Sequence, residues 1–346
     1  MRILVATDAW RPQINGVVHS LEQTAAAARS QGYDIDFLTP QGFRTIPMPT
    51  YPDIKLALAS WGAIAKRIDA AGAEHIHIAT EGPIGFAARR YCLARNRVFT
   101  TSYHTRFPEY IAQRVPIPER WTYAALRRFH APAAAVMVPT PTIRDELTQR
   151  GFARVKVWSR GVDQLTFHPR ETSVLDFPRP IFLCVGRVAV EKNLGALLSL
   201  KLPGSTVIVG DGPARASLER QYPHAHFLGS RSGEALAQTF ASADVFVFPS
   251  RTDTFGIVLI EALASGLPVA AYPVAGPLDV IGNSGAGVLS EDLGAACLAA
   301  LQIPRAVARE HSMQFTWRES ARQFLQNIEQ SREAWVAPAQ AARLGS

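Results

Sequence analysis

One stretch of the chain joins an apolar run to two carboxylates. The letters VFVFPSRTDTFGIVLIEALASGLPVAA begin as a strand-like run, pass through a polar loop with Asp253 to Gly256, and continue as an apolar helix-like run that contains Glu261. Asp253 precedes the glycine and is expected in the loop, whereas Glu261 is expected on the helix. The two carboxylates can then reach different parts of one ligand.

The start of this predicted helix is suited to binding an anion. The first backbone N–H groups of a helix have no partner within it, so those of Phe255, Gly256 and Ile257 are expected to point toward a phosphate. A carboxylate within IVLIEALA would be costly to bury unpaired, and Glu261 can accept hydrogen bonds from two ribose hydroxyls. A structural partner for Glu261 is the alternative.

Two cations follow another predicted strand. GRVAVEKN places Arg187 and Lys192 on a strand-to-helix loop, where a planar guanidinium and a compact ammonium suit a diphosphate and can offset charge that develops on a leaving group. Simple exposure to solvent is the alternative interpretation. The nearby VIVGDGP segment, with Gly210 and Gly212, is interpreted mainly as a tight turn.

Weaker signals follow strands in the first half of the chain. Gly16 begins a predicted helix after the first strand, where its N–H can approach an anion, although a simple turn explains it equally well. His104 in SYHTRFPEY follows a predicted strand and can hydrogen-bond a sugar hydroxyl; a structural histidine is the alternative. Glu81 in ATEGPIG is a still weaker candidate at another strand end.

These residues need parallel strands to position them. Short apolar runs alternate with helical patterns throughout, which predicts parallel sheets covered by helices on both faces. The expected strands are 3–7, 34–39, 75–79, 98–103, 134–140, 155–159, 181–186, 206–212, 226–229, 245–250 and 268–272. Ligands of such sheets bind beyond the carboxyl ends of the strands, where the candidate residues occur.

The chain of 346 residues is long enough for two domains. We expect two doubly wound, Rossmann-like α/β domains with a cleft between them. The first covers residues 1–168 and the second 181–315, and they are joined by a proline-rich linker at 169–180. A polar amphipathic helix is expected at 316–335, with no prediction of where it docks.

Composition indicates the class of the protein and its expected location. With 47% hydrophobic and 19% charged residues, the chain is typical of a globular protein. Its three cysteines have no metal-ligand or CxxC spacing, so neither a disulfide framework nor a metal site is expected. No export signal is visible at the N-terminus, and the longest apolar runs fall short of the ~20 residues that cross a bilayer. A cytoplasmic location is expected.

The net charge of +7 is concentrated in the first half of the chain. Between Arg89 and Arg128 there are nine arginines and only two acidic residues. In IPERWTYAALRRFHAP, the residues Arg120, Trp121, Arg127 and Arg128 have the composition of a helix at an anionic membrane surface. A solvated helix face is the alternative, and the absence of any nucleic-acid-reading motif argues against DNA or RNA.

Five motifs together resemble the family-4 retaining glycosyltransferases of the two-domain GT-B architecture. INGVV, SYHTRFPEY, GRVAVEKN, GDGP and TDTFGIVLIEA occur in that family's order. The resemblance implies Gly16 beside the donor phosphate or sugar, His104 near the donor sugar and Glu261 on the ribose. It also implies Arg187 and Lys192 on the diphosphate. Asp253 occupies the first acidic position of the family's E-x7-E motif with a shorter side chain.

The resemblance implies transfer of a sugar from a nucleotide diphosphate to a hydroxyl, with retention and without a cofactor or metal. SYHTRFPEY with TDTFG looks like members that glycosylate lipids, such as diacylglycerol glucosyl-, glucuronosyl- and sulfoquinovosyltransferases and phosphatidylinositol mannosyltransferases. We expect a UDP-sugar donor, a lipid acceptor and peripheral contact with the inner face of the membrane. The alternatives are a GDP-mannose-dependent α-mannosyltransferase acting on a phospholipid or polysaccharide, a GT-B sugar-nucleotide epimerase or phosphorylase, and a non-catalytic basic binding protein.

Overall fold

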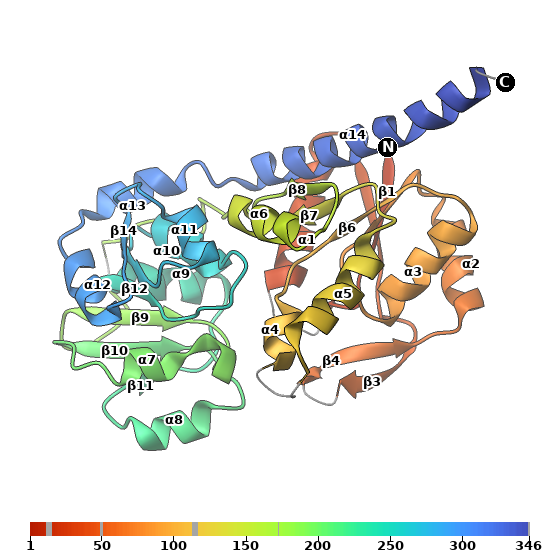
Figure 1. Cartoon of the computed structure of the whole chain (residues 1–346). Coiled ribbons are helices and arrows are strands. Elements are labelled where there is room, and N and C mark those ends of the chain that lie inside the picture. Colours follow the sequence, from red (N-terminus) through yellow and green to blue (C-terminus); the bar gives the residue numbers. More distant parts are fainter. Residues whose placement is uncertain (12–15, 49–50, 113–116, 172, 345–346) are drawn as a thin grey trace. The chain divides into compact units, whose positions relative to one another are not determined.

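The computed structural model describes residues 1–11, 16–48, 51–112, 117–171 and 173–344. These residues form two compact units, labelled by their elements in Figure 1. The first unit combines Met1–Arg160 with Trp317–Ser346, and the second is Gly161–Thr316. Each unit contains a six-stranded sheet in which every pairing is parallel. The two doubly wound α/β sheets predicted from the sequence are therefore present.

The first sheet has the strand order β2-β1-β5-β6-β7-β8. Its strands are β1 (Arg2–Ala6), β2 (Asp34–Leu38), β5 (His75–Ile78), β6 (Phe99–Ser102), β7 (Val136–Val138) and β8 (Val155–Val157). A separate antiparallel hairpin, which the sequence analysis did not predict, is formed by β3 (Arg44–Met48) and β4 (Tyr51–Leu58).

Alternate residues of this sheet pack against different helices. Leu4 and Ala6 face a core with α2 and α3, whereas Ile3 and Val5 face a core with α1 and α14. Both faces of the sheet are therefore buried, which explains the nearly continuous apolar runs. The helices of this unit are α1 (Gly16–Arg29), α2 (Trp61–Ala71), α3 (Pro83–Ala94), α4 (Phe107–Ala112), α5 (Glu119–His130), α6 (Pro141–Gln149) and α14 (Trp317–Leu344).

The second sheet has the order β11-β10-β9-β12-β13-β14. Its strands are β9 (Ile181–Val185), β10 (Ser205–Val209), β11 (His226–Phe227), β12 (Val245–Phe248), β13 (Val269–Ala271) and β14 (Gly287–Leu289), the last of which was not predicted. One face packs against α9, α10 and α13, and the other against α7 and α12. The helices of this unit are η1 (Val190–Lys192), α7 (Leu194–Leu198), α8 (Arg215–Gln221), α9 (Gly233–Ser242), α10 (Ile257–Ala264), α11 (Ala275–Val280), α12 (Leu293–Ala300) and α13 (Arg305–Ser312).

The division of the chain differs from the predicted boundaries at 168 and 180. The first unit ends at Arg160, and the segment that follows packs with the second unit because Val162, Phe167 and Leu175 are buried in its core. The expected linker is therefore in part a core segment of the second unit. Prolines mark interruptions of helix and strand, but they do not show which core a segment joins.

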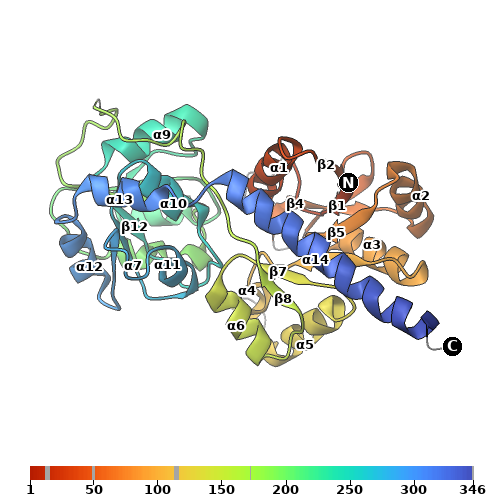
Figure 2. The same cartoon turned by 90° about the horizontal axis from the view of Figure 1, so that it is seen from above.

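The last helix returns to the first unit. Helix α14 runs beside α1 and buries Phe324, Leu325 and Ile328 against the first sheet (Figures 1 and 2). It continues to Leu344, well beyond the predicted end at residue 335. Among the helices in the described ranges, none is both long enough and apolar enough to cross a membrane.

Candidate active site

The strand order of the second sheet reverses at β9. This first strand of the unit lies between β10 and β12, so the loops that follow β9 and β12 lie side by side at the carboxyl edge. Asn193 Nδ2 donates to the carbonyl oxygen of Pro249 at 3.0 Å, and Ser250 Oγ donates to the carbonyl oxygen of Glu191 at 3.3 Å. In doubly wound sheets such a switch point is where ligands bind.

The two loops also join Lys192 and Asp253. Lys192 Nζ lies 2.6 Å from Asp253 Oδ1, and both side chains are largely buried, with exposed fractions of 24% and 16%. Asp253 Oδ2 is buried and has no hydrogen-bond partner in the described part of the chain. Asp253 therefore orients the ammonium through one oxygen and keeps its other oxygen available to a ligand. The sequence placed both residues near the donor but did not predict the ion pair.

Helix α10 begins beside this pair. Gly256 adopts φ 80° and ψ 77°, a left-handed conformation that favours glycine, and no side chain caps the helix. Within the described ranges, the backbone N–H groups of Phe255, Gly256 and Ile257 donate no hydrogen bond. The predicted helix start and its uncapped N–H groups are thus present, which leaves donors and a positive helix end for an anion. Their predicted contact with phosphate stays a prediction.

Glu261 lies one helical turn beyond Ile257, on the same side of α10 and about 6 Å further along the axis. Its side chain is 8% exposed, and no hydrogen bond or ion pair to its carboxylate occurs among the residues whose positions are described. Burial raises the pKa of this carboxyl group to about 7. An acceptor left without a structural partner on a buried helix is the arrangement expected for a group that binds hydroxyls of a ligand.

The glycines of the neighbouring GDG turn have a structural role. A Cβ atom on Gly210 would lie 1.8 Å from the carbonyl oxygen of Gly186, and one on Gly212 would lie 2.4 Å from that of Val188. These glycines therefore let the loops after β9 and β10 pack backbone against backbone. Arg187 lies on the first of these loops, directly after Gly186, as predicted from the sequence.

In the first unit, the loops after β1 and β5 are joined by a residue that the sequence analysis missed. The carboxylate of Asp8 accepts hydrogen bonds from the N–H groups of Ile84 at 2.9 Å and Gly85 at 3.2 Å, and from the hydroxyl of Thr80 at 3.0 Å. Asp8 thereby occupies the N-terminus of α3, which excludes a ligand phosphate from that position. The polar TDAW segment directly after β1 was the available signal.

Two other candidates of the first unit, Gly16 and Glu81, have different surroundings. Gly16 is the first residue of α1, but the preceding residues 12–15, including the start of INGVV, lie outside the described residues. Glu81 Oε1 lies 3.2 Å from His130 Nε2, so this weak candidate has a structural partner.

His104 lies two residues after β6 and is half-buried. Its Nδ1 atom is 3.0 Å from Nη2 of Arg160, a residue that follows β8 and was not singled out in the sequence. Burial, together with the nearby Arg160 and His77, lowers the pKa of His104 well below its ordinary value. The ring is therefore neutral at physiological pH and can serve as a hydrogen-bond donor or acceptor.

Fewer arginines between Arg89 and Arg128 are available to a partner than the sequence predicted. Several of these arginines serve the fold: Arg97 donates to the carbonyl oxygen of Ala73, Arg95 pairs with Asp69, Arg89 donates to the carbonyl oxygens of Phe129 and Arg128, and Arg106 pairs with Glu109 and Glu146. Arg114 lies outside the described residues. A count of arginines in the sequence therefore overstates the charge available to a partner.

Helix α5 presents three more of these arginines, whereas Arg90 on α3 lies over the ring of Trp61. Arg120, Arg127 and Arg128 are exposed, and Trp121 is 64% exposed. Tyr123 and Phe129, the other aromatic residues of IPERWTYAALRRFHAP, are instead buried against the unit. The amphipathic pattern thus has a structural cause, and among the aromatic residues of this helix only Trp121 is exposed.

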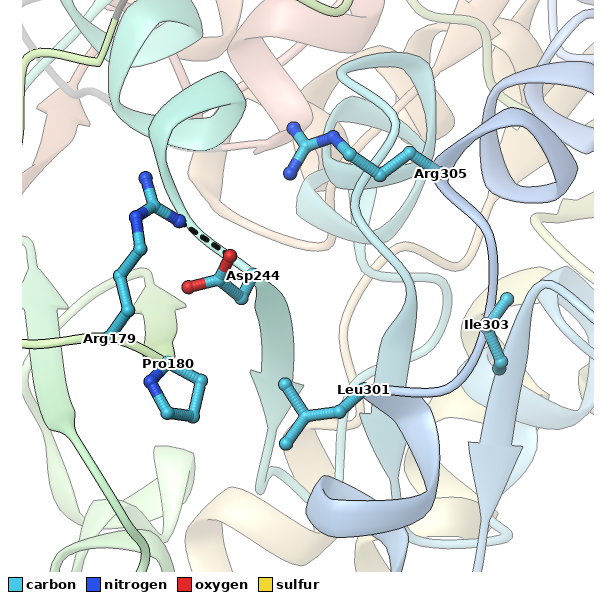
Figure 3. Close-up of a pocket in the computed structure, with 6 residues that line it drawn as sticks. All are labelled: Arg179, Pro180, Asp244, Leu301, Ile303 and Arg305. Atoms are coloured by element: carbon cyan, nitrogen blue, oxygen red, sulfur yellow. Dashed lines mark hydrogen bonds and ion pairs between the residues drawn. The ribbon is translucent and has the colours of Figure 1, made fainter.

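A pocket of about 350 Å³ lies elsewhere in the second unit, as Figure 3 shows. It lies where β9 and β12 begin, at the edge opposite the loops described above. Its charged groups are committed to the fold: Arg179 pairs with Asp244 at 2.5 Å, and Arg305 donates to the carbonyl oxygens of Ala241 and Ala243. This pocket is therefore not a candidate for the active site. The residues that the structure describes also contain no group of three or more His, Cys, Asp or Glu side chains arranged to hold a metal ion.

Comparisons with known proteins identify the family of this chain. Residues 14–164 match the model of "Glycosyltransferase Family 4", and residues 179–303 match that of "Glycosyl transferases group 1". The chain is 33% identical over 259 residues to sulfoquinovosyl transferase SQD2 of Arabidopsis thaliana, covering 69% of this chain and half the length of that protein.

A second relative is covered over most of its length. The chain is 31% identical over 319 residues to a GDP-mannose-dependent alpha-mannosyltransferase of Mycobacterium tuberculosis, covering 84% of this chain and 83% of that protein. It is 24% identical over 321 residues to alpha-monoglucosyldiacylglycerol synthase of Streptococcus pneumoniae, covering 79% and 71% of the two proteins.

A solved structure shows the same fold. Sucrose-phosphate synthase from Thermosynechococcus elongatus matches with a TM-score of 0.77 and 20% identity, covering 96% of this chain and 99% of that one. Together with the family models, these likenesses confirm the resemblance expected from the five motifs. The chain is a glycosyltransferase that belongs to family 4 and has the GT-B fold.

Proposed function

We propose that this glycosyltransferase moves a sugar from a nucleotide-diphosphate donor, preferably a UDP-sugar, to a hydroxyl of a lipid such as diacylglycerol, with retention at the anomeric carbon. The observation that carries the proposal is the carboxyl edge of the second sheet. There the Lys192–Asp253 pair lies beside the uncapped start of α10, and the unpaired carboxylate of Glu261 lies one turn further along.

These groups match the parts of a sugar nucleotide. The start of α10, Lys192 and Arg187 supply hydrogen-bond donors and positive charge for the diphosphate, and Glu261 accepts from the ribose hydroxyls. Asp253 Oδ2 accepts from a hydroxyl of the sugar. In the first unit, Gly16 is proposed to lie beside the donor phosphate or sugar, and His104 is proposed to contact the sugar.

The proposed reaction uses no protein nucleophile. The bond between the anomeric carbon and the diphosphate oxygen breaks, and the acceptor oxygen bonds to that carbon on the same face. The acceptor proton passes to the departing diphosphate. Arg187, Lys192 and the helix start stabilise the charge that develops on the diphosphate. Because these cationic groups are built into the protein, we propose that transfer requires no bound metal.

The lipid acceptor is supported by one relative and one surface. The Streptococcus pneumoniae relative is named for a diacylglycerol product. Arg120, Trp121, Arg127 and Arg128 are exposed along α5, and we propose that they contact the anionic cytoplasmic leaflet, with Trp121 at the level of the headgroups.

A second candidate is GDP-mannose-dependent α-mannosyl transfer to a phospholipid or polysaccharide. It is favoured by the Mycobacterium tuberculosis relative, which carries that name and is covered over 83% of its length. The fold is the same for both candidates, so only the donor and acceptor distinguish them.

The test is a product analysis. The purified protein is incubated with UDP-glucose, UDP-glucuronate or GDP-mannose and with vesicles that contain diacylglycerol or phosphatidylinositol, and the lipids are analysed by mass spectrometry. A hexosyl- or glucuronosyl-diacylglycerol that forms with a UDP-sugar, and not with the Lys192→Ala variant, supports the proposal. A product with GDP-mannose alone establishes the second candidate, and conversion of the donor without an acceptor establishes an epimerase.

A further inference from the structure

Arg160 is a buried cation that has no acidic partner among the residues described by the structure. Its side chain is 5% exposed, and in the described part of the chain no carboxylate contacts its guanidinium. Nη1 donates to the carbonyl oxygens of Trp158 at 2.6 Å and Ser159 at 3.1 Å, and Nη2 lies 3.0 Å from His104 Nδ1. Burial lowers the pKa of Arg160 to about 9. Such a cation is costly to bury, so a role beyond packing is expected.

The contact with His104 determines which ring nitrogen carries the proton. A guanidinium has only donors, so an imidazole nitrogen that contacts it must be the acceptor. Nδ1 of His104 is therefore unprotonated, and the proton of the neutral ring is on Nε2. The ring can then offer a ligand an N–H donor and not a lone pair.

The surrounding residues hold both side chains in place. The guanidinium carbon of Arg160 lies 4.3 Å from the ring centre of Trp158, and the His104 ring meets the same indole edge-on at 5.7 Å. Trp158 is fully buried, and its Nε1 donates to Ser320 Oγ on α14 at 3.1 Å. Because β7 lies between β6 and β8, Arg160 reaches His104 across the end of one strand.

We propose that Arg160 is a positioning residue that keeps the proton of His104 on Nε2, so that His104 donates a hydrogen bond to an oxygen of the bound sugar. The inference rests on the proposed function for the sugar contact, whereas the protonation of His104 is a property of the protein alone.

The charges near His104 act in the same direction. Burial is the largest effect that disfavours an imidazolium at His104, and the charges of Arg160, which follows β8, and of His77 on β5 add to it. Trp158 packs against the ring without charge. When the guanidinium is removed, the ring is expected to exchange between tautomers and to titrate nearer its ordinary pKa of ~6.5.

The test is nitrogen NMR of the full chain labelled with ¹⁵N-histidine, with His104 assigned by loss of its signals in the His104→Gln variant. In the wild type we expect an unprotonated Nδ1 and a protonated Nε2 that do not change between pH 8 and pH 5.5. A protonated Nδ1, or a ring that titrates in this interval, overturns the proposal without an Arg160 variant and without an activity assay.

Arg160→Gln and Arg160→Lys then test the cause. Both variants are expected to show averaged tautomers or a titration of His104, with the lysine variant less affected because it retains one cationic donor. Arg154→Gln is the matched control, because Arg154 donates to the carbonyl oxygens of Ala131 and Ala133 and makes no hydrogen bond to His104 among the described residues. If His104 signals are the same in the wild type and in folded Arg160 variants, Arg160 has only a structural role.

Kinetics connect the tautomer to transfer. With the donor and acceptor that give product, kcat/KM of the wild type should show no loss from His104 down to pH 5.5. Arg160→Gln should lose at least tenfold at pH 8 and acquire a further decline below pH 7. An unchanged pH profile in a variant that shows the altered tautomer contradicts the sugar contact. Absence of product from the wild type with every donor refutes the proposed function and leaves the NMR result to decide the tautomer.

Discussion

The unpaired carboxylate of Glu261 predicts that nucleotide binding depends on pH. Burial raises its pKa from 4.5 to about 7. At pH 8 the ionised form is therefore destabilised in the folded protein by roughly 3 kcal/mol, taking 1.36 kcal/mol for each pH unit of the shift. Hydroxyls of a bound ribose donate to the ionised form and lower its pKa, so binding releases a proton.

The size of the effect follows from the fraction of ionised carboxylate. If only the ionised form accepts both ribose hydroxyls, about a tenth of the protein is competent at pH 6 and nearly all of it at pH 8, so the apparent Kd should be roughly tenfold weaker at pH 6. Isothermal titration calorimetry with UDP and with GDP at both pH values measures this ratio. Buffers of different ionisation enthalpy report the released proton.

Glu261→Gln is the informative variant because it keeps the shape and removes the titration. It should bind nucleotide weakly at both pH values and retain only the pH dependence of the nucleotide phosphate. Glu234→Gln, which changes an exposed carboxylate paired with Arg170 in the same unit, should behave as the wild type. The reasoning is refuted if Glu261→Gln shows the same tenfold change as the wild type.

The same variant makes a prediction about stability. A carboxyl group whose pKa is higher in the folded state stabilises the fold below pH 4.5 and loses that contribution as the pH rises through about 7. Denaturant unfolding of Glu261→Gln should therefore give a free energy of unfolding up to roughly 3 kcal/mol higher than that of the wild type at pH 8, and a similar value at pH 4. A less stable variant at pH 8 would show that Glu261 has a structural partner.

Three further predictions concern the charge on the diphosphate, the membrane and acid stability. Lys192→Ala should lower kcat/KM for transfer by roughly 100-fold or more, because it removes the ammonium group. Asp253→Asn keeps the ammonium group of Lys192 and should lower kcat/KM less. Equal activity of Lys192→Ala and the wild type would contradict the role of the cation. Replacing Arg127 and Arg128 with glutamate should weaken binding to anionic vesicles at least roughly tenfold at low salt, as measured by sedimentation, and leave the Kd for nucleotide unchanged. Unchanged sedimentation would show that α5 does not contact the membrane. His75 is buried, and its pKa is lowered from 6.5 to about 3. The free energy of unfolding should therefore fall as the pH drops below 6.5, by nearly 3 kcal/mol at about pH 4.5. His75→Gln should flatten the pH dependence of unfolding in this interval, and an equally steep curve would contradict the prediction.

Local sequence patterns predicted the helix start and the loop positions of the candidate site, because both depend on residues that are neighbours in the sequence. Gly256 between an apolar strand and an apolar helix was sufficient to predict the start of α10, and the isolated carboxylate of Glu261 was visible within that helix. Arg187 and Lys192 were placed correctly after β9 because strand ends are marked by the change from apolar to polar residues.

Pairs that depend on strand order were not predictable in this way. Lys192 and Asp253 are separated by 61 residues and meet only because β9 and β12 are neighbours in the sheet. Arg160 and His104 meet because they follow strands on either side of β7. No local pattern contains that order.

Helix α5 shows a different limit of the sequence. Its composition gave aromatic and basic residues but not the face on which each lies, and Tyr123 packs inward while Trp121 is exposed. The boundary between the units was misplaced for a related reason, since the burial of Phe167 in the second core depends on contacts far along the chain.

The central claim is that the carboxyl edge of the second sheet binds the sugar nucleotide. A crystal structure of the protein with UDP or GDP tests it most directly. We predict ribose hydroxyls on the Glu261 carboxylate, and the diphosphate on Lys192 and the N–H groups at the start of α10. A nucleotide bound elsewhere, for example in the pocket beside Arg179 and Arg305, with Glu261 and Lys192 making no contact, would contradict the account.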